Sequence, residues 1–561
     1  PKGPRGPVPQ VGTGELNHVE LGPDGAVRTK PSAIAYRTAD PFWSVGDGQG
    51  VTSTILNVPF AYPPDPLKNG RMLCGLGVPD LRGTTSTFFD LSDAFTSDAL
   101  QERLSGGQRL RLSFDRNGTA EVPVPGPRDE RHGFRDPNAF TQATLQLKVD
   151  RAAGAGMASF NGQSAELAVG QWSEWVPVEF KMSPQFTVRA LTRFFPVELG
   201  DTVRVYMSCM QFHPEDPYTP ISQPDEYSAD LMERFGPYKT IGWAYDTHAF
   251  RQGALAEDAF LEDVRAGMRF REQLTMDALE RDEHLLLSVW TATDRVGHMF
   301  WRFRDEQHPM YNPELAERFG KALEESYQIA DRITGRVLDK LSDDDLFMVL
   351  SDHGFASWRT GFNLNDWLEQ EGYLTLSNRQ MAERGFLLGV DWSQTQAYCI
   401  GLSSLYLNIQ GRESEGSVAP DRAAALRAEL RDKLLTVKDP ANGAAIFSNV
   451  YTREDFSGDA VDNAPDLSLG YAQYYQSSKT AAKGAVGNGL TESNDDKWSG
   501  EHAASDVAEL PGILFCNRAI EKDDPDIRDL GVPALVDLVV YDAAGRVAER
   551  DPGEFAGDNL V

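Results

Sequence analysis

The chain has 561 residues, 41% of them hydrophobic, and a formal net charge of −30 at pH 7. Because single hydrophobic cores stop growing near ~250–300 residues, we expect two or three domains. The acidic balance argues against binding to a nucleic-acid duplex, and no apolar run reaches the ~18–20 residues of a membrane-spanning helix. The four cysteines lie far apart without a CxxC pair, which predicts buried free thiols. No signal-peptide pattern opens the chain, and the sequence leaves the compartment, cytoplasmic or periplasmic, open.

The order of the elements predicts three parts. Residues 1–95 open with a Pro/Gly-rich stretch and continue with a short apolar strand at 51–59, as the first part of an α/β domain. Residues 96–215 alternate with period two between Gly, Asn and Asp turns, which predicts an antiparallel β insertion. Its strands are expected near residues 109–114, 143–149, 175–180 and 202–207. Residues 216–561 return to strands and helices and form the main part of the α/β domain.

The helical periodicity of the third part places helices over residues 257–283, 313–340 and 420–435, with another helix starting at 365–371. The 313–340 helix joins an apolar run at 285–290 to a second run at 346–350, and we expect the second run to be a buried strand. A strand, a crossover helix and a second strand form a βαβ unit, which is parallel and right-handed by default.

Both of these strands end in an Asp and a His. Asp294 and His298 follow the first strand four residues apart, so a turn leaving the strand brings both to one ion. Asp352 and His353 follow the second strand and are adjacent, so pleating points them apart. Open α/β sheets place their active sites at the carboxyl ends of strands, and Asp with His is a ligand set for zinc-type ions. The pattern predicts two metals, as used in phosphoryl transfer.

The other histidines carry weaker signals. His502 stands in the segment 498–502 after a Gly-rich stretch at 484–489, and on its own a lone loop His is usually an ordinary surface residue. The remaining histidines lie in turns, in polar loops or beside helices, and we interpret them as structural: His18, His132, His213, His248, His284 and His308. Trp172 and Trp175 lie three apart in a strand-like run, which predicts that they face opposite sides and that one is buried.

These motifs resemble the alkaline phosphatase superfamily, in its type I phosphodiesterase/nucleotide pyrophosphatase branch. The pattern is closest to the bacterial and archaeal predicted phosphohydrolase or phosphomutase proteins. The resemblance runs from about Pro31 to Asn517. Besides the metal motifs it is carried by residues 57–64, 75–83, 170–175, 391–398 and 411–412.

The resemblance implies a ligand set. One zinc would be held by Asp294, His298 and His502, and a second by Asp352 and His353, with manganese as the alternative ion. The family also uses an Asp near its first strand and a Thr or Ser nucleophile at a helix start. Both belong upstream of this chain in the family pattern, so no catalytic residue is assigned here. A longer protein or a separate N-terminal segment is expected to supply them, and this chain alone is expected to be slow or inactive. Residues 83–86, Gly-Thr-Thr-Ser, offer alternative hydroxyls after Asp80.

The expected fold is α/β, a mostly parallel sheet sandwiched by helices in the manner of alkaline phosphatase, with an antiparallel β insertion. The expected function is metal-dependent hydrolysis of a small phosphorylated substrate, of the phosphodiesterase, nucleotide pyrophosphatase or phosphomonoesterase type. Two alternatives stay open. A phosphomutase would need basic residues that clamp a phosphorylated acid, and the sequence assigns none. A non-catalytic scaffold would keep the fold and one metal. Four aromatic residues follow the metal motifs: Phe300, Trp301, Phe303 and Phe355. We interpret them as core residues, in preference to residues that stack on the substrate.

Overall fold

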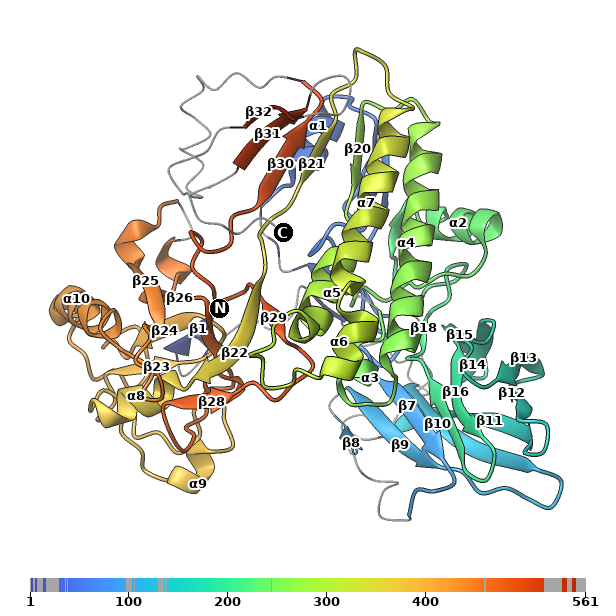
Figure 1. Cartoon of the computed structure of the whole chain (residues 1–561), viewed down its shortest axis with the longest axis horizontal. Helices are drawn as coiled ribbons and strands as arrows, with labels where there is room; N and C mark the ends of the chain where they lie inside the picture. Colours follow the sequence, from blue (N-terminus) through green and yellow to red (C-terminus); the bar gives the residue numbers. More distant parts are fainter. Residues whose placement is uncertain are drawn as a thin grey trace. The chain divides into compact units, whose positions relative to one another are not determined.

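The computed structural model describes residues 30–518 apart from 36, 38, 97–102, 105, 130–135, 137–138, 244 and 459–460. It also describes five short strands outside that range: β1 (Lys2–Gly3), β2 (Gly6–Pro7), β3 (Gly14–Leu16), β31 (Asp537–Tyr541) and β32 (Val547–Arg550). The chain divides into two compact units, Val11–Arg295 and Pro1–Gln10 with Val296–Val561 (Figure 1). Mixed α/β structure with several sheets is found, as predicted.

A small, mainly parallel sheet lies in the first unit. β5 (Ser53–Leu56) pairs in parallel with β6 (Gly70–Leu73) and with β20 (Leu285–Ser288). β19 (Ser222–Gln223) adds an antiparallel edge beside β6. Every residue of β5 is buried, as expected for a central strand of a parallel sheet.

Helix α4 (Glu257–Leu279) leads into β20. Two carboxylates, Glu257 and Asp258, stand in its first turn, where their negative charge interacts favourably with the positive end of the helix dipole. The predicted helix over 257–283 is confirmed, but it ends four residues early. Asp282 takes a positive φ of 53°, so the helix cannot continue through it. The unit also contains α1 (Phe42–Gly48), α2 (Tyr227–Phe235) and α3 (Thr247–Arg251), and β4 (Ala33–Ala35), which pairs with β3.

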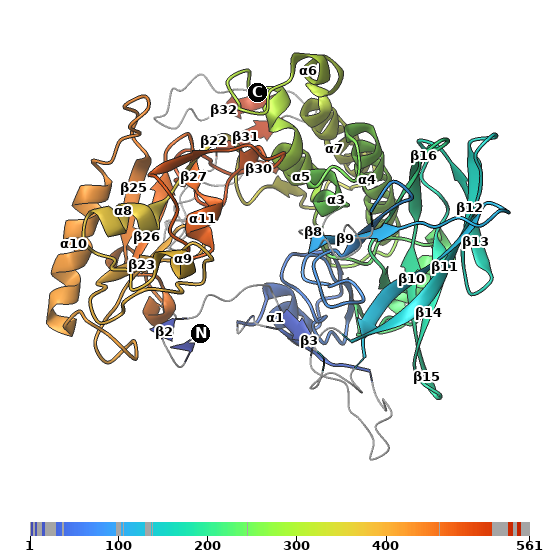
Figure 2. The same ribbon diagram turned by 90° about the horizontal axis from the view of Figure 1, so that it is seen from below.

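The β-rich part of this unit forms three further sheets, and Figure 2 shows the strands β10 to β15 gathered together. The orders are β16-β17-β7-β9-β8, β10-β11-β12-β13 and β14-β15-β18. The bounds are β7 (Phe88–Ser92), β8 (Arg103–Leu104), β9 (Gly107–Arg111), β10 (Thr119–Arg128), β11 (Phe140–Asp150), β12 (Ala155–Phe160), β13 (Gln163–Ala168), β14 (Val176–Ser183), β15 (Phe186–Thr192), β16 (Phe194–Leu199), β17 (Val203–Met207) and β18 (Gln211–Phe212). The four predicted strands are found as β9, β11, β14 and β17. Burial alternates residue by residue along β11, the half-buried pattern on which the prediction depends. The bounds of the insertion, residues 96–215, stay a prediction.

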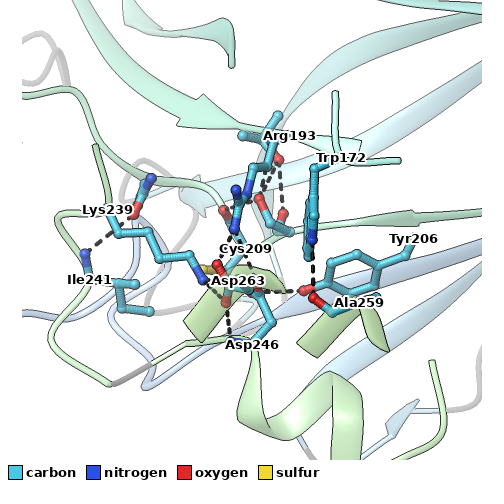
Figure 3. Close-up of polar contacts among 12 residues, drawn as sticks. Trp172, Arg193, Tyr206, Cys209, Lys239, Ile241, Asp246, Ala259 and Asp263 are labelled. Carbon is cyan, nitrogen blue, oxygen red and sulfur yellow. Dashed lines mark hydrogen bonds and ion pairs between the residues drawn. The ribbon is translucent and has the colours of Figure 1, made fainter. Parts of the chain in front are cut away.

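A buried network of charges ties this β-rich part to α4 (Figure 3). Arg193, between β15 and β16, forms an ion pair with Asp263 of α4, and Lys239 lies 2.6 Å from the same carboxylate and 2.8 Å from Asp246. The guanidinium lies 3.9 Å from the ring centre of Trp172 and 4.9 Å from that of Trp175.

The prediction that the two tryptophans face opposite sides is therefore wrong, since both rings meet one side chain, Arg193. Residues 172–175 are not a strand, so strand alternation does not apply to them. Both side chains are half-buried, and the Trp172 indole Nε1 donates to the Ala259 carbonyl of α4 at 3.1 Å.

The second unit begins within helix α5 (Ala292–Phe300), which crosses the division of the chain. The single helix predicted over 313–340 is wrong, because the structure has two, α6 (Pro313–Phe319) and α7 (Ala322–Leu338). Gly320 is a poor helix former, and Lys321 leaves helical values with a ψ of 1°, so a new helix starts at the next residue.

The rest of the described part of the second unit consists of the two-stranded sheet β1-β2, three larger sheets and short helices. β21 (Met348–Leu350) pairs antiparallel with β30 (Ile513–Cys516), and β30 pairs in parallel with β31, which pairs with β32. A second sheet has the order β23-β24-β26-β25, and a third has β27-β22-β28 with β29 beside β22. Their bounds are β22 (Ala356–Phe362), β23 (Ala397–Cys399), β24 (Ser404–Leu407), β25 (Phe447–Thr452), β26 (Leu467–Tyr471), β27 (Tyr474–Ser477), β28 (Thr491–Ser493) and β29 (Gly500–Glu501). The helices are α8 (Leu364–Gln370), α9 (Arg379–Ala382), α10 (Ala423–Leu434), which runs beside β25 in Figure 2, and α11 (Lys479–Ala482).

Two expectations about the strands that carry the metal motifs are not met. The run 346–350 was expected to be buried, but Leu346, Met348 and Leu350 are exposed, since β21 lies at the edge of its sheet among the described strands, next to β30. Among the described strands β20 pairs with β5 and β21 with β30, so the parallel pair expected between them is not formed there.

Other predictions are confirmed. All four cysteines are free and buried. None of the described helices has the length and apolar character that crossing a membrane requires.

Candidate metal centre

Helix α5 carries the first two predicted ligands. Asp294 stands in its first turn and His298 one turn later, so the two side chains share a face of the helix. The Asp294 side chain is partly exposed, and its Oδ1 lies 3.7 Å from Nη2 of Arg295. His298 is buried.

The segment 498–502 is held against α5 by hydrogen bonds. Nδ1 of His298 lies 2.8 Å from the carbonyl oxygen of Gly500. Because a carbonyl only accepts, Nδ1 carries the hydrogen and Nε2 is the ring nitrogen suited to a metal. The N–H of Ser499 donates to the His298 carbonyl at 2.7 Å. A Cβ on Gly500 would stand 2.5 Å from the carbonyl oxygen of Gly297, so glycine at 500 permits this close approach.

The three histidines of the metal motifs meet in this unit. The rings of His353 and His502 are stacked, with centroids 3.5 Å apart and planes 11° apart, and the His298 and His502 centroids are 5.0 Å apart. Nδ1 of His353 also lies 2.8 Å from a carbonyl oxygen, that of Gly354. Phe355 packs edge-on against His298 with centroids 4.8 Å apart.

Asp352 stays beside His353 but points largely to solvent. Its side chain is 84% exposed, and its Oδ2 lies 3.4 Å from Nε2 of His353. The structure thus brings His298, His353 and His502 together, and it keeps Asp352 beside His353. The division of these five residues between two ions stays a prediction.

Glu501 is the neighbour that the sequence reading missed. One ligand atom each of His298, Glu501 and His502 lie within 4.8 Å of one another. The Glu501 carboxylate accepts from the indole Nε1 of Trp498 at 2.7 Å and from the N–H of His502 at 2.9 Å. Its position directly before a candidate His was the available signal, but only the fold places its carboxylate beside His298.

The donor set fits a divalent ion of the zinc type. Imidazole nitrogens and a carboxylate oxygen are its preferred ligands, and two of the rings have Nδ1 against a backbone carbonyl, the arrangement that orients a metal-binding His. Phe300 and Phe303 are buried, as predicted, whereas Phe355 lies against the histidines.

The hydroxyl groups after Asp80 have structural partners. The Thr84 hydroxyl donates to Oδ2 of Asp80 at 2.6 Å and contacts the Thr87 hydroxyl at 2.7 Å, while Ser86 is buried. Burial raises the pKa of Asp80, although this carboxylate accepts three backbone N–H bonds in the turn. Thr85, which is exposed like Thr84, has its Oγ1 3.2 Å from Nε2 of His248.

A mixed α/β chain that gathers three imidazoles beside a carboxylate has the features of an enzyme. The chain belongs to the type I phosphodiesterase / nucleotide pyrophosphatase family, whose family model matches residues 170–499, more than half of its length. Membership suggests a phosphoester hydrolase. Four of the predicted ligands lie inside the matched segment and His502 follows shortly after its end. Neither the curated proteins nor the solved structures include a match to the chain.

Proposed function

We propose that the protein is a metal-dependent hydrolase of phosphate esters acting on a small phosphorylated substrate. The observation that carries the proposal is the meeting of His298, His353 and His502 from three distant segments, with Glu501 beside them. Family membership supports the reaction class. A scaffold protein has no need to gather these side chains.

The proposal divides the five predicted ligands between two ions. Asp294, His298 and His502 hold one ion and Asp352 with His353 holds the second, with zinc as the preferred ion and manganese as the alternative. Bound there, the ions supply Lewis-acid polarisation of a phosphoryl oxygen. The backbone carbonyls of Gly500 and Gly354 fix the orientation of the two rings that they contact.

The proposal also assigns roles to the parts of the chain. The α/β parts, residues 1–95 and 216–561, carry the chemistry, and residues 96–215 are the insertion. The nucleophile is not assigned to a residue of this chain. The likeness to bacterial and archaeal phosphohydrolases also stays a prediction.

Hydrolysis of bis(4-nitrophenyl) phosphate by the full-length protein tests the proposal. Chelation should abolish hydrolysis and added zinc should restore it, while His298→Ala should lose at least a hundredfold in rate and in metal affinity because the ion lacks a ligand. His284→Ala is the matched control, since His284 is an exposed histidine whose hydrogen bonds among the described residues go to Thr52. Hydrolysis that survives chelation, or that His298→Ala leaves intact, would overturn the proposal.

A further inference from the structure

A short loop after helix α9 of the second unit (Figure 1) holds the most exposed large apolar side chain in the part of the chain that the structure describes. Phe386 is 76% exposed, and Leu388, two residues later, is 42% exposed. Leu402, in the turn of residues 400–403, is 49% exposed. We call Phe386, Leu388 and Leu402 the apolar tip. Single exposed apolar residues are common on folded proteins, so the tip matters only if its members are grouped and held in place.

The loop and the turn lie side by side because both bond to the same segment. The N–H of Phe386 donates to the carbonyl of Lys483 at 2.7 Å, and the N–H of Gly401 donates to the carbonyl of Ala482 at 3.0 Å. Two consecutive residues of one segment therefore hold the loop and the turn next to each other.

The bases of the loop and of the turn also meet. A Cβ built on Gly484 would stand 3.1 Å from Cγ of Leu387 and 3.2 Å from Cδ1 of Ile400, so both side chains pack around this glycine. Leu387 and Ile400 are half-buried and pack against the hydrophobic core of the second unit. The apolar tip thus has a fixed apolar base beneath it.

The backbone of the loop is strained. Phe386 and Leu387 have φ values of 57° and 55°, and among the described residues they are the one consecutive pair of non-glycine residues with positive φ. The N–H of Leu387 donates to the Gly484 carbonyl at 2.9 Å, which helps to hold this conformation. Large side chains rarely adopt it, and both the strain and the exposure of an aromatic ring oppose folding. Positions where such costs persist are candidates for a function.

Basic side chains flank the apolar tip in a chain of net charge −30. Arg384 is exposed and directly precedes the loop residue Gly385. Lys483 is also exposed, and its Cβ would lie 3.3 Å from a Cβ built on Gly385. These two cations stand against one exposed neighbouring carboxylate in the sequence, Glu383. Since the Debye length is about 8 Å at physiological salt, charges this close to a contact outweigh the more distant acidic surface.

We propose that the apolar tip, flanked by Arg384 and Lys483, docks on an anionic lipid surface. Exposed Phe and Leu side chains enter the boundary between headgroups and acyl chains, while neighbouring Lys and Arg stay with anionic headgroups. The positive charge beside the tip is complementary to such headgroups, which favours lipid over a protein partner. The contact is small and therefore reversible, and it places the protein at a membrane surface without inserting a helix.

Flotation of the full-length protein with lipid vesicles tests the docking surface. The unaltered protein should float with vesicles of phosphatidylcholine mixed with phosphatidylserine. Phe386→Asn should bind these vesicles more weakly by about tenfold or more, because it removes the buried area of the ring. Phe456→Asn is the matched control, an exposed phenylalanine of the same unit, and should bind as the unaltered protein does. The inference fails if the unaltered protein does not float, or if Phe386→Asn floats equally well.

The charge of the lipid is tested in the same assay. Arg384→Gln should weaken binding to the mixed vesicles about fivefold, because each basic residue near an anionic surface adds attraction. Arg422→Gln, at another exposed arginine of the second unit, should leave the binding unchanged. Equal binding of the unaltered protein to the mixed vesicles and to pure phosphatidylcholine would overturn the assignment to anionic lipid.

Melting temperatures and light scattering address the other roles of the tip. Asn tolerates positive φ better than Phe, so Phe386→Asn should melt no lower than the unaltered protein. A large loss of melting temperature would instead show a structural ring and overturn the inference. Light scattering that shows self-association of the unaltered protein, abolished in Phe386→Asn and without vesicle binding, would assign the tip to a second copy and equally overturn it.

The docking surface is independent of the proposed function. Phe386→Asn should hydrolyse bis(4-nitrophenyl) phosphate at the rate of the unaltered protein. Vesicle binding by a protein that shows no metal-dependent hydrolysis would overturn the proposed function and support the docking surface.

Discussion

At the scale of single residues, the histidines of this chain divide by what their two ring nitrogens contact. Nε2 of His308 lies 3.0 Å from the carbonyl oxygen of Trp358, and Nδ1 accepts from the N–H of Met310 at 3.0 Å. Both ring nitrogens of His308 therefore form hydrogen bonds with backbone groups, and the side chain is buried. This supports its interpretation as structural. In His298 and His353 a backbone carbonyl lies against Nδ1, and the proposal assigns Nε2 as the ligand atom.

His308 should make the protein less stable in mild acid. Burial lowers its pKa to about 4, below the ~6.5 of an unfolded histidine. The unfolded state binds the proton first as pH falls, so the stability that neutral His308 contributes is present above pH ~6.5 and is lost between ~6.5 and ~4. Urea unfolding across this range should give a steeper loss of unfolding free energy for the unaltered protein than for His308→Asn. An NMR titration that places the His308 pKa near 6.5 would contradict the account.

The residues that the sequence identified are those with a local signature, such as Asp294 with His298 four residues apart. Glu501 has no such signature. It becomes notable through its place beside His298, far along the chain, and this place depends on how the elements pack.

At the scale of elements, the network around Arg193 explains how a β-rich region is fixed to helix α4 (Figure 3). Asp263 contacts both Arg193 and Lys239, and Tyr206 donates to Oδ1 of Asp246 at 2.8 Å. The two cations of this network, Arg193 and Lys239, balance its two carboxylates, Asp246 and Asp263. Burial alone would raise the pKa of Asp263, but the charges of Lys239 and Arg193 hold it below the ordinary value.

Asp263→Asn should cost about 3–5 kcal/mol of unfolding free energy, because it leaves two buried cations short of a carboxylate. A surface comparison is Arg234→Ala, which breaks ion pairs of a partly exposed arginine with Asp230 and Asp277 and should cost about 0–1 kcal/mol. Denaturant unfolding of both variants provides the measurement. Equal costs would mean that the network does not hold the β-rich region to α4.

Elements with a strong local period were predictable, as the strands β11 and β17 and the helix α4 illustrate. The break between α6 and α7 at Gly320 was not, since one glycine inside a helical pattern is often tolerated. The pairing of β21 with β30 also lay beyond the sequence, because strand partners are chosen by tertiary packing and not by local pattern.

At the scale of the whole molecule, each compact unit has its own hydrophobic core. One core is built on the β-rich strands of the first unit, and the other surrounds α8, α10 and the sheet β23-β24-β26-β25 of the second. The candidate histidines His298, His353 and His502 all lie in the second unit. The net charge of −30 favours the approach of a divalent cation.

An anomalous difference map, recorded at the zinc edge from crystals of the zinc-loaded protein, tests the central claim most directly. The account predicts a strong peak about 2.0–2.1 Å from ring nitrogens of both His298 and His502, the distance of a zinc–imidazole bond. A map from saturating zinc in which no peak touches either histidine, or in which zinc lies only on unrelated surface residues, would contradict the account.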